Sequence, residues 1–268
     1  MFKKTHKQIA IEKAILSHLE GKSAEIAKYI FNDPEIQTLQ DYANTVSIKR
    51  LGFNDHGPVH MRTAALNALI MFDLLHDAGI KLNLESEKLG TYEDSELCVL
   101  TASLLHDIGM TATRDHHEII GIIFAEPIIR RLLDAVYKDN IHKKTILKAM
   151  IIEGIFGHMA TEKIYSLEAG LVLIGDGCDM EKGRSRITTL LSQQPRVGDI
   201  HKYSASSIQK VNILPGNKKP IKILIEMSQS AGFFQIEEVL FPKIISSPVK
   251  PYIELYGQVK NKEMMQYL

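Results

Sequence analysis

Apolar residues recur at intervals of three and four positions through about the first 195 residues of the chain, with polar residues between them. This spacing places apolar side chains on one face of a helix. It predicts helices over residues 7–30, 34–50, 58–77, 94–108, 115–138, 140–157 and 162–180, with a polar connection over 80–93. Pro58 suits the first turn of its helix, and Pro127 predicts a kink or break. Neither a strand–helix alternation nor a glycine-rich phosphate loop is visible, so this part is predicted to be all-helical.

The pattern changes after about residue 198. Residues 211–214 lead into a Pro-Gly-Asn turn, and residues 221–227 nearly alternate apolar and polar side chains, which predicts a hairpin. A helix over 231–246 and a strand over 251–259 complete a small α+β unit. We therefore expect a helical domain over 1–197 and a small α+β domain over 198–268, either regulatory or dimerising. An exposed edge on the last strand would allow a homo-oligomer to form by sheet pairing.

Composition excludes some classes of partner. Lysine plus arginine equals aspartate plus glutamate at 32 each, so no overall field favours a nucleic acid or a membrane surface. There is no run of about 18 apolar residues, so no transmembrane helix is expected. Cys98 and Cys178 lie in apolar stretches without metal-ligand spacing. They predict two reduced core thiols in a cytoplasmic protein.

Candidate chemistry centres on the pair His106-Asp107, where an apolar helix approaches Gly109. A buried aspartate is costly unless it is paired or bound to a metal. His56 and His60 lie four residues apart at the start of another predicted helix, and both could face one cleft. The residues before that helix also suit a simple cap, so this second pair alone leaves a structural role open.

A second acidic segment follows the apolar run 171–175. The carboxylate of Asp176 is therefore expected to be buried, which demands a cation or several hydrogen-bond donors. Asp179 comes one turn later. It is expected either to accept a hydrogen bond behind the site or to pair with Arg184 or Arg186.

The order of an isolated histidine, a His-Asp pair and a late aspartate resembles the HD superfamily of metal-dependent phosphohydrolases. The resemblance covers roughly residues 50–190. It implies that the domain is all-helical and that it is an HD-type phosphohydrolase. It also implies four protein ligands for one metal ion. Those ligands would be His60, His106, Asp107 and Asp176.

Further matches point to a second ion. His56 resembles the proton-donating histidine of cyclic-nucleotide phosphodiesterases in the superfamily. The run from His117 to Gly121 resembles the His-Pro-x-x-Gly segment of the HD-GYP type, with glutamate in place of proline. His158 falls where binuclear members place another histidine. The resemblance thus implies a second ion held by His117 and His158 with Asp107 bridging, although spacing leaves His116 open as the alternative to His117.

Imidazoles with carboxylates suit Mn, Fe, Ni, Zn or Mg, as one or two ions per chain, since no thiolate forces zinc. The expected enzyme hydrolyses a phosphomonoester or phosphodiester, with a nucleotide as the expected small-molecule substrate. A metal-bound hydroxide would attack, while His56 and Asp107 would be catalytic, His56 by protonating the leaving oxygen. Arg62, Arg184 and Arg186 are candidates for the substrate phosphate, because guanidinium matches phosphate geometry. The alternative is a ligand-sensing or regulatory protein with a vestigial HD site and a C-terminal output module.

Overall fold

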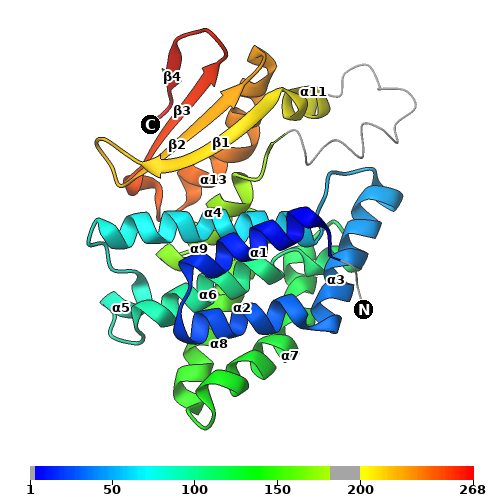
Figure 1. Ribbon diagram of the computed structural model, residues 1–268, viewed down its shortest axis with the longest axis vertical. Coiled ribbons are helices and arrows are strands. Elements are labelled where there is room, and N and C mark those ends of the chain that lie inside the picture. The colour runs from blue at the N-terminus through cyan, green and yellow to red at the C-terminus, as the bar shows by residue number, and fades with distance from the viewer. Residues whose placement is uncertain (1–3, 182–199) are drawn as a thin grey trace.

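A computed structural model describes residues 4–181 and 200–268. It shows a body of packed helices with a small four-stranded sheet at one end (Figure 1). The prediction of a mainly helical chain followed by a small α+β part is confirmed. The predicted boundary between residues 197 and 198 lies outside the described residues.

The helical body follows the predicted order of helices. It contains α1 (His6–His18), α2 (Gly21–Asn32), α3 (Pro34–Thr45), α4 (Pro58–Asp77), α5 (Asn83–Ser86), α6 (Tyr92–Leu105), α7 (His117–Tyr137), α8 (Ile141–Gly157) and α9 (Leu167–Gly177). A π-helical turn, η1 (Val46–Leu51), extends α3, and a 3-10 turn, η2 (Ile108–Thr111), follows α6. No helix among the residues placed by the structure is long and apolar enough to span a bilayer.

Three details differ from the predicted helices. The helix predicted over 7–30 is two helices, because the backbone is extended at Leu19 and Glu20 and Gly21 has a φ of +51°. Helix α7 continues through Pro127 without a break, and the carbonyl freed by the proline belongs to Ile123, on an exposed face. The last helix of the body begins only after Ser166, whose side chain caps it.

Helix α6 is the centre of the body. Every residue from Asp94 to Leu105 is buried, as expected of a helix enclosed on all sides. It contacts α2, α4, α8 and α9. Cys98 on this helix and Cys178 after α9 are both buried and free, as predicted for core thiols. The C-terminal end of α6 therefore delivers the residues that follow it, His106 and Asp107, into the interior.

The sheet has the strand order β1-β2-β3-β4. Its strands are β1 (Ile208–Pro215), β2 (Ile221–Met227), β3 (Ile253–Val259) and β4 (Met264–Gln266). The first two form the predicted antiparallel hairpin, β3 runs parallel to β2, and β4 runs antiparallel to β3. The expectation of an exposed edge over 251–259 is wrong for residues 256–258, because β4 pairs with the outer side of β3 there. Strand β4 was not predicted, because its three residues, all exposed in the structure, do not alternate apolar and polar side chains.

Short helical segments surround the strands. Helix α11 (Ile200–Ser207) precedes β1, and η5 (Lys250–Tyr252) precedes β3. The helix predicted over 231–246 is a succession of η3 (Ser230–Gly232), α12 (Phe233–Gln235), η4 (Ile236–Leu240) and α13 (Phe241–Ser246). Strands β1 and β2 contact α4, and α13 contacts α9. The C-terminal part thus packs directly on the helices that carry the candidate site.

Arg62 is a core residue with no exposed surface. Its guanidinium donates hydrogen bonds to Glu12 at 2.8 Å, Gln40 at 2.8 Å, Gln37 at 3.0 Å and the carbonyl oxygen of Pro58 at 2.9 Å. These bonds join α1, α3 and α4. The expectation that this arginine contacts a substrate phosphate is therefore wrong.

The physical reason is the helical repeat of α4. Residues two apart on a helix lie on different faces, so Arg62 points away from the face that carries His60. A charged side chain in the core then needs the acid and amides that surround it.

Replacing this arginine tests its structural role. Arg62→Ala is expected to lower the free energy of unfolding by about 3–5 kcal/mol, because Glu12 and two glutamines lose their partner in the core. Urea denaturation measures the change. Arg130→Ala removes an arginine whose pair with Glu126 is exposed, and should have a far smaller effect. Equal losses in the two variants would contradict this role.

Candidate metal centre

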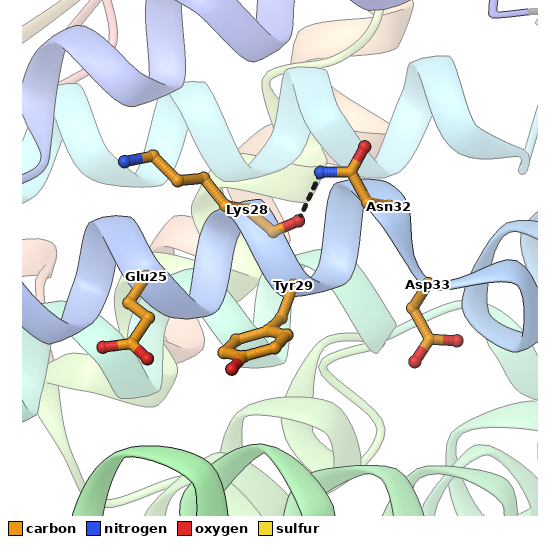
Figure 2. A pocket seen from close by; sticks show the side chains of 5 residues that line it. All are labelled: Glu25, Lys28, Tyr29, Asn32 and Asp33. Carbon is orange, nitrogen blue, oxygen red and sulfur yellow. Dashed lines mark hydrogen bonds between the residues drawn. The ribbon is translucent and has the colours of Figure 1, made fainter.

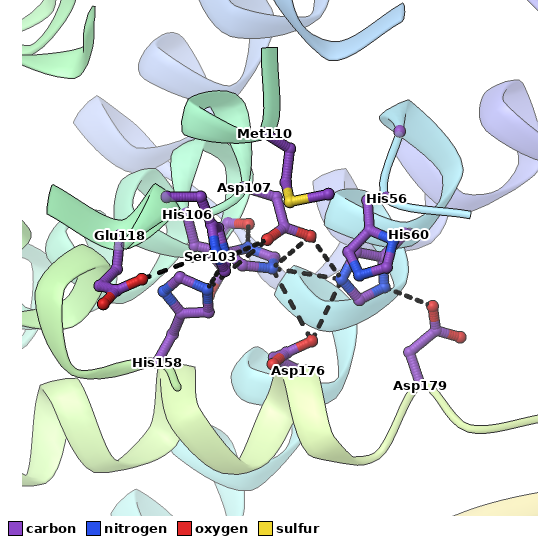
Figure 3. Close-up of polar contacts among 12 residues, drawn as sticks. His56, His60, Ser103, His106, Asp107, Met110, Glu118, His158, Asp176 and Asp179 are labelled. Carbon is purple, nitrogen blue, oxygen red and sulfur yellow. Dashed lines mark hydrogen bonds and ion pairs between the residues drawn. The ribbon is translucent and has the colours of Figure 1, made fainter. Parts of the chain in front are cut away.

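The six side chains predicted as metal ligands meet inside the helical body, although they come from segments far apart in the sequence. Figure 3 labels all of them except His117. They are His60 on α4, His106 and Asp107 just after α6, His117 at the start of α7, His158 just after α8, and Asp176 near the end of α9. Each is at most 7% exposed. Five helices therefore contribute to one buried polar cluster.

A close approach of two backbones holds His117 beside Asp107. A Cβ atom on Gly109 would lie 1.9 Å from the carbonyl oxygen of His117 and 2.5 Å from the nitrogen of Gly121. Because no real side chain tolerates such contacts, only glycine lets η2 pack against the first turn of α7. The glycine after the His-Asp pair is thus part of how the site is built.

The four histidines of the cluster share one orientation. Nδ1 of His106, His117 and His158 lies 2.8, 2.9 and 2.6 Å from the carbonyl oxygen three residues earlier. Nδ1 of His60 lies 2.7 Å from Oδ2 of Asp179, which is the acceptor role expected for that aspartate. A carbonyl or carboxylate oxygen only accepts, so each Nδ1 carries a hydrogen. In the neutral ring, Nε2 then presents its lone pair to the cluster.

Those Nε2 atoms face one another in pairs. Nε2 of His60 lies 3.2 Å from that of His106, and Nε2 of His117 lies 3.0 Å from that of His158. Asp107 separates the pairs by giving each its own oxygen: Oδ2 is 3.1 and 3.3 Å from the first pair, and Oδ1 is 3.1 and 3.5 Å from the second. Lone pairs at these distances repel each other unless a proton or a cation lies between them.

The state of Asp107 also calls for positive charge. Its Oδ2 is buried and accepts no hydrogen bond from the described part of the chain. Burial favours the neutral acid, but the positive charges of His106 and His56, together with the close polar contacts to His106 and His117, hold the pKa of Asp107 well below its usual value. The carboxylate is therefore ionised, which requires protonated imidazoles or a bound cation beside it.

The pKa values of the second histidine pair, His117 and His158, indicate which ring could supply this positive charge. Burial lowers the pKa of His158 to about 4, so this ring is neutral near pH 7. Burial would also lower the pKa of His117, but the Asp107 carboxylate raises it above its usual value. A metal at this pair would therefore meet one neutral ring, while protonation of the other ring would compete with metal binding.

Asp176 has different partners on its two oxygens. Oδ1 lies 3.1 Å from Nε2 of His60 and 3.8 Å from that of His106. Oδ2 accepts a hydrogen bond from the ammonium of Lys243, on α13. Burial raises the pKa of Asp176, but Lys243 and His60 hold it well below its usual value. The role of Lys243 was not predicted from the sequence, where it lies 67 residues from Asp176 in no recognisable motif.

His56 lies beside the cluster. Its Nδ1 is 2.7 Å from the carbonyl oxygen of Asn54 and 2.9 Å from Oγ of Ser47. Its ring packs edge-on against that of His60, with the centroids 5.7 Å apart. The structure thus places His56 next to the predicted ligands in a fixed orientation, as a neighbouring proton donor requires.

The remaining predicted residues have mixed outcomes. His116 has a positive φ of 58° and a side chain that is 80% exposed, so of the two adjacent histidines His117 is the one inside the cluster. Glu118, for which no role was predicted, is buried, with Oε2 3.5 Å from Nδ1 of His117. Arg184 and Arg186 lie outside the described residues.

A surface pocket of about 370 Å³ lies elsewhere, along α2 (Figure 2). It is lined by Glu25, Lys28, Tyr29, Asn32 and Asp33. The pocket shares no residue with the buried cluster and contains no histidine. It is therefore not the candidate site.

The described chain contains buried His/Asp groups that could hold a metal ion. One group is His60, His106 and Asp176, the other is His106, Asp107 and His158, and in each the ligand atoms lie within 4.8 Å of one another. His106 belongs to both groups by this distance. The contacts of Asp107 place His106 in the group of His60, because both histidines lie near Oδ2 of this carboxylate.

No family model and no solved structure matches the chain. The chain is similar to the uncharacterized protein MJ1020 from Methanocaldococcus jannaschii, with 34% identity over 248 residues. The match covers 92% of this chain and 93% of the relative, so it takes in both the helical body and the sheet.

Proposed function

We propose that this chain, which belongs to the same protein family as MJ1020 of Methanocaldococcus jannaschii, is a metal-dependent phosphohydrolase with an HD-type site. The observation that carries the proposal is the position of Asp107 between two pairs of imidazole nitrogens, with a separate oxygen toward each pair. The expected substrate is a phosphomonoester or phosphodiester, with a nucleotide as the expected class.

The cluster divides into two sets of ligands. In the proposed site, His60, His106, Asp107 and Asp176 would hold one divalent ion, and His117 and His158 would hold a second, with Asp107 contributing to both sets. Neutral nitrogens combined with carboxylate oxygens suit Mn, Fe, Ni, Zn or Mg. The carboxylate of Asp179 behind His60 fixes the tautomer of that ring and raises its basicity.

Bound divalent cations would polarise a phosphoryl oxygen and lower the pKa of a water molecule. The chain's own contribution is to orient and to transfer protons. One oxygen of Asp107 faces each pair of histidines, so this carboxylate would fix the distance between the two sets of ligands. His56 is held through Nδ1 by the carbonyl of Asn54, and as an imidazolium it would protonate the departing oxygen of the substrate.

The alternative, a ligand-sensing protein with a vestigial site, remains a prediction. A vestigial site has no need to retain a full set of ligands. All six predicted ligand side chains are buried together here, and their orientation is fixed by acceptors behind the rings. This arrangement supports the enzyme over the sensor.

The first test is metal content and hydrolysis. The purified protein is expected to contain divalent metal by elemental analysis, and to hydrolyse a chromogenic phosphodiester or a nucleotide from a panel with added Mn. Asp107→Ala should reduce metal content and hydrolysis to background, because it removes a ligand shared by both sets, whereas His106→Ala should abolish hydrolysis and lose the ion held with His60. His142→Ala, at an exposed histidine on α8, is the matched control and should change neither. An intact protein without metal and without hydrolysis would contradict the proposal and favour the sensor.

The second test concerns the number of ions. His117→Ala and His158→Ala are each expected to lose about one metal equivalent while the set around His60 keeps its own ion. His116→Ala changes the adjacent but exposed histidine and should retain both equivalents. Elemental analysis after equilibrium dialysis measures the stoichiometry. An unchanged metal content in both variants would indicate a mononuclear site.

The third test separates proton transfer from metal binding. His56→Ala is expected to keep its metal but to turn over roughly 10²-fold more slowly or worse, since the general acid is lost. The acid should matter least for substrates whose leaving group needs no proton, such as a nitrophenolate. Steady-state rates on activated and unactivated esters measure this difference. Near-normal turnover on both would remove His56 from the mechanism.

A further inference from the structure

One side chain of the C-terminal part reaches the buried cluster. Lys243 lies on α13, and its ammonium donates hydrogen bonds to Oδ2 of Asp176 and, at 2.8 Å, to the carbonyl oxygen of His158. The side chain is only 12% exposed. A lysine is rarely buried without a partner that needs its charge, so these contacts indicate a specific role.

The packing of α13 against α9 makes room for this lysine. A Cβ atom on Gly177 would lie 3.1 Å from Cδ of Lys243 and 3.1 Å from Cδ1 of Leu240. Because Gly177 has no side chain, the apolar stem of Lys243 passes across the end of α9 and brings the ammonium to Asp176. Lysine commonly buries its stem in this way while its charged end finds a polar partner.

The contacts of Lys243 join the ends of two ligand-bearing helices. Asp176 lies near the C-terminus of α9, and His158 directly follows α8. Carbonyl groups at helix C-termini lack partners within the helix and carry partial negative charge, so an ammonium is favourable at this position. Lys243 thus ties together two segments that each supply a candidate ligand.

The same hydrogen bond decides how Asp176 faces the histidines. With Oδ2 held by Lys243, only Oδ1 lies toward Nε2 of His60, at 3.1 Å. Without the lysine, Oδ2 would be a buried acceptor lacking its donor, and the carboxylate would be free to turn away. Hydrogen bonds behind a metal ligand commonly set its orientation in this manner.

We propose that Lys243 is a positioning residue through which the C-terminal part sets the metal affinity of the centre. This inference rests on the proposed metal site but not on the reaction catalysed there. The ammonium of Lys243 also repels a divalent cation. Positioning of Asp176 and charge repulsion therefore change the metal affinity in opposite directions. Positioning predicts that removing the charge weakens metal binding, whereas repulsion predicts that it tightens.

The test compares metal affinity in two variants of one position. Lys243→Met keeps the apolar stem and removes the charge, and it is expected to raise the dissociation constant for Co²⁺ at least about tenfold. Lys243→Arg keeps the charge and should restore most of the affinity. Lys262→Met, at an exposed lysine of the same C-terminal part, is the control and should leave the affinity unchanged. Titration followed by the visible absorption of Co²⁺ also reports the ligand geometry, which loss of stability alone would not alter.

A double-mutant cycle identifies the route of the effect. In an Asp176→Asn background, Lys243→Met should weaken Co²⁺ binding little further, because the lysine acts through that carboxylate. Equal weakening in both backgrounds, or Lys243→Met binding as tightly as the wild type or more tightly, would overturn the inference. Wild-type protein that binds metal but hydrolyses no phosphate ester would remove the phosphohydrolase proposal and leave this one. Wild-type protein that binds no metal would overturn both.

Discussion

The burial of mutually facing donor atoms is the constraint on which this structure depends. Four imidazole nitrogens, both oxygens of Asp107 and one oxygen of Asp176 point toward one another in a region with almost no access to water. Such an arrangement is unfavourable unless positive charge lies within it. The surrounding helices are positioned accordingly. Helix α6 is enclosed on all sides, so its end brings His106 and Asp107 inside, and α4, α7, α8 and α9 each contribute a candidate ligand from a turn or an end.

The same constraint explains why the small sheet is not merely attached to the helices. Lys243 comes from the C-terminal part, yet it neutralises a carboxylate that the helical body has buried. The hairpin β1–β2 rests on α4, the helix that carries His60, while α13 lies against α9, the helix that carries Asp176. The two parts therefore share one electrostatic network, and a change in either is expected to reach the other.

Much of the fold could be predicted from local patterns, because a three- and four-residue apolar repeat is a property of each helix alone. The ligand set came from a resemblance in the order of histidines and aspartates, and the structure brings those residues together. Arg62 shows what that reasoning overlooked, since two residues after His60 is a different face of the helix. Lys243 could not be predicted, because its role exists only after residues 67 positions apart in the chain are packed together.

Backbone carbonyl groups fix three of the four rings, and this has a consequence for mutational robustness. The acceptors behind His106, His117 and His158 belong to the peptide bond, so a substitution at residue 103, 114 or 155 changes the side chain but leaves the oxygen in place. Only His60 depends on an acceptor that one nucleotide change can remove, the carboxylate of Asp179. The centre can therefore tolerate sequence drift around most of its histidines, and its vulnerability is concentrated behind one.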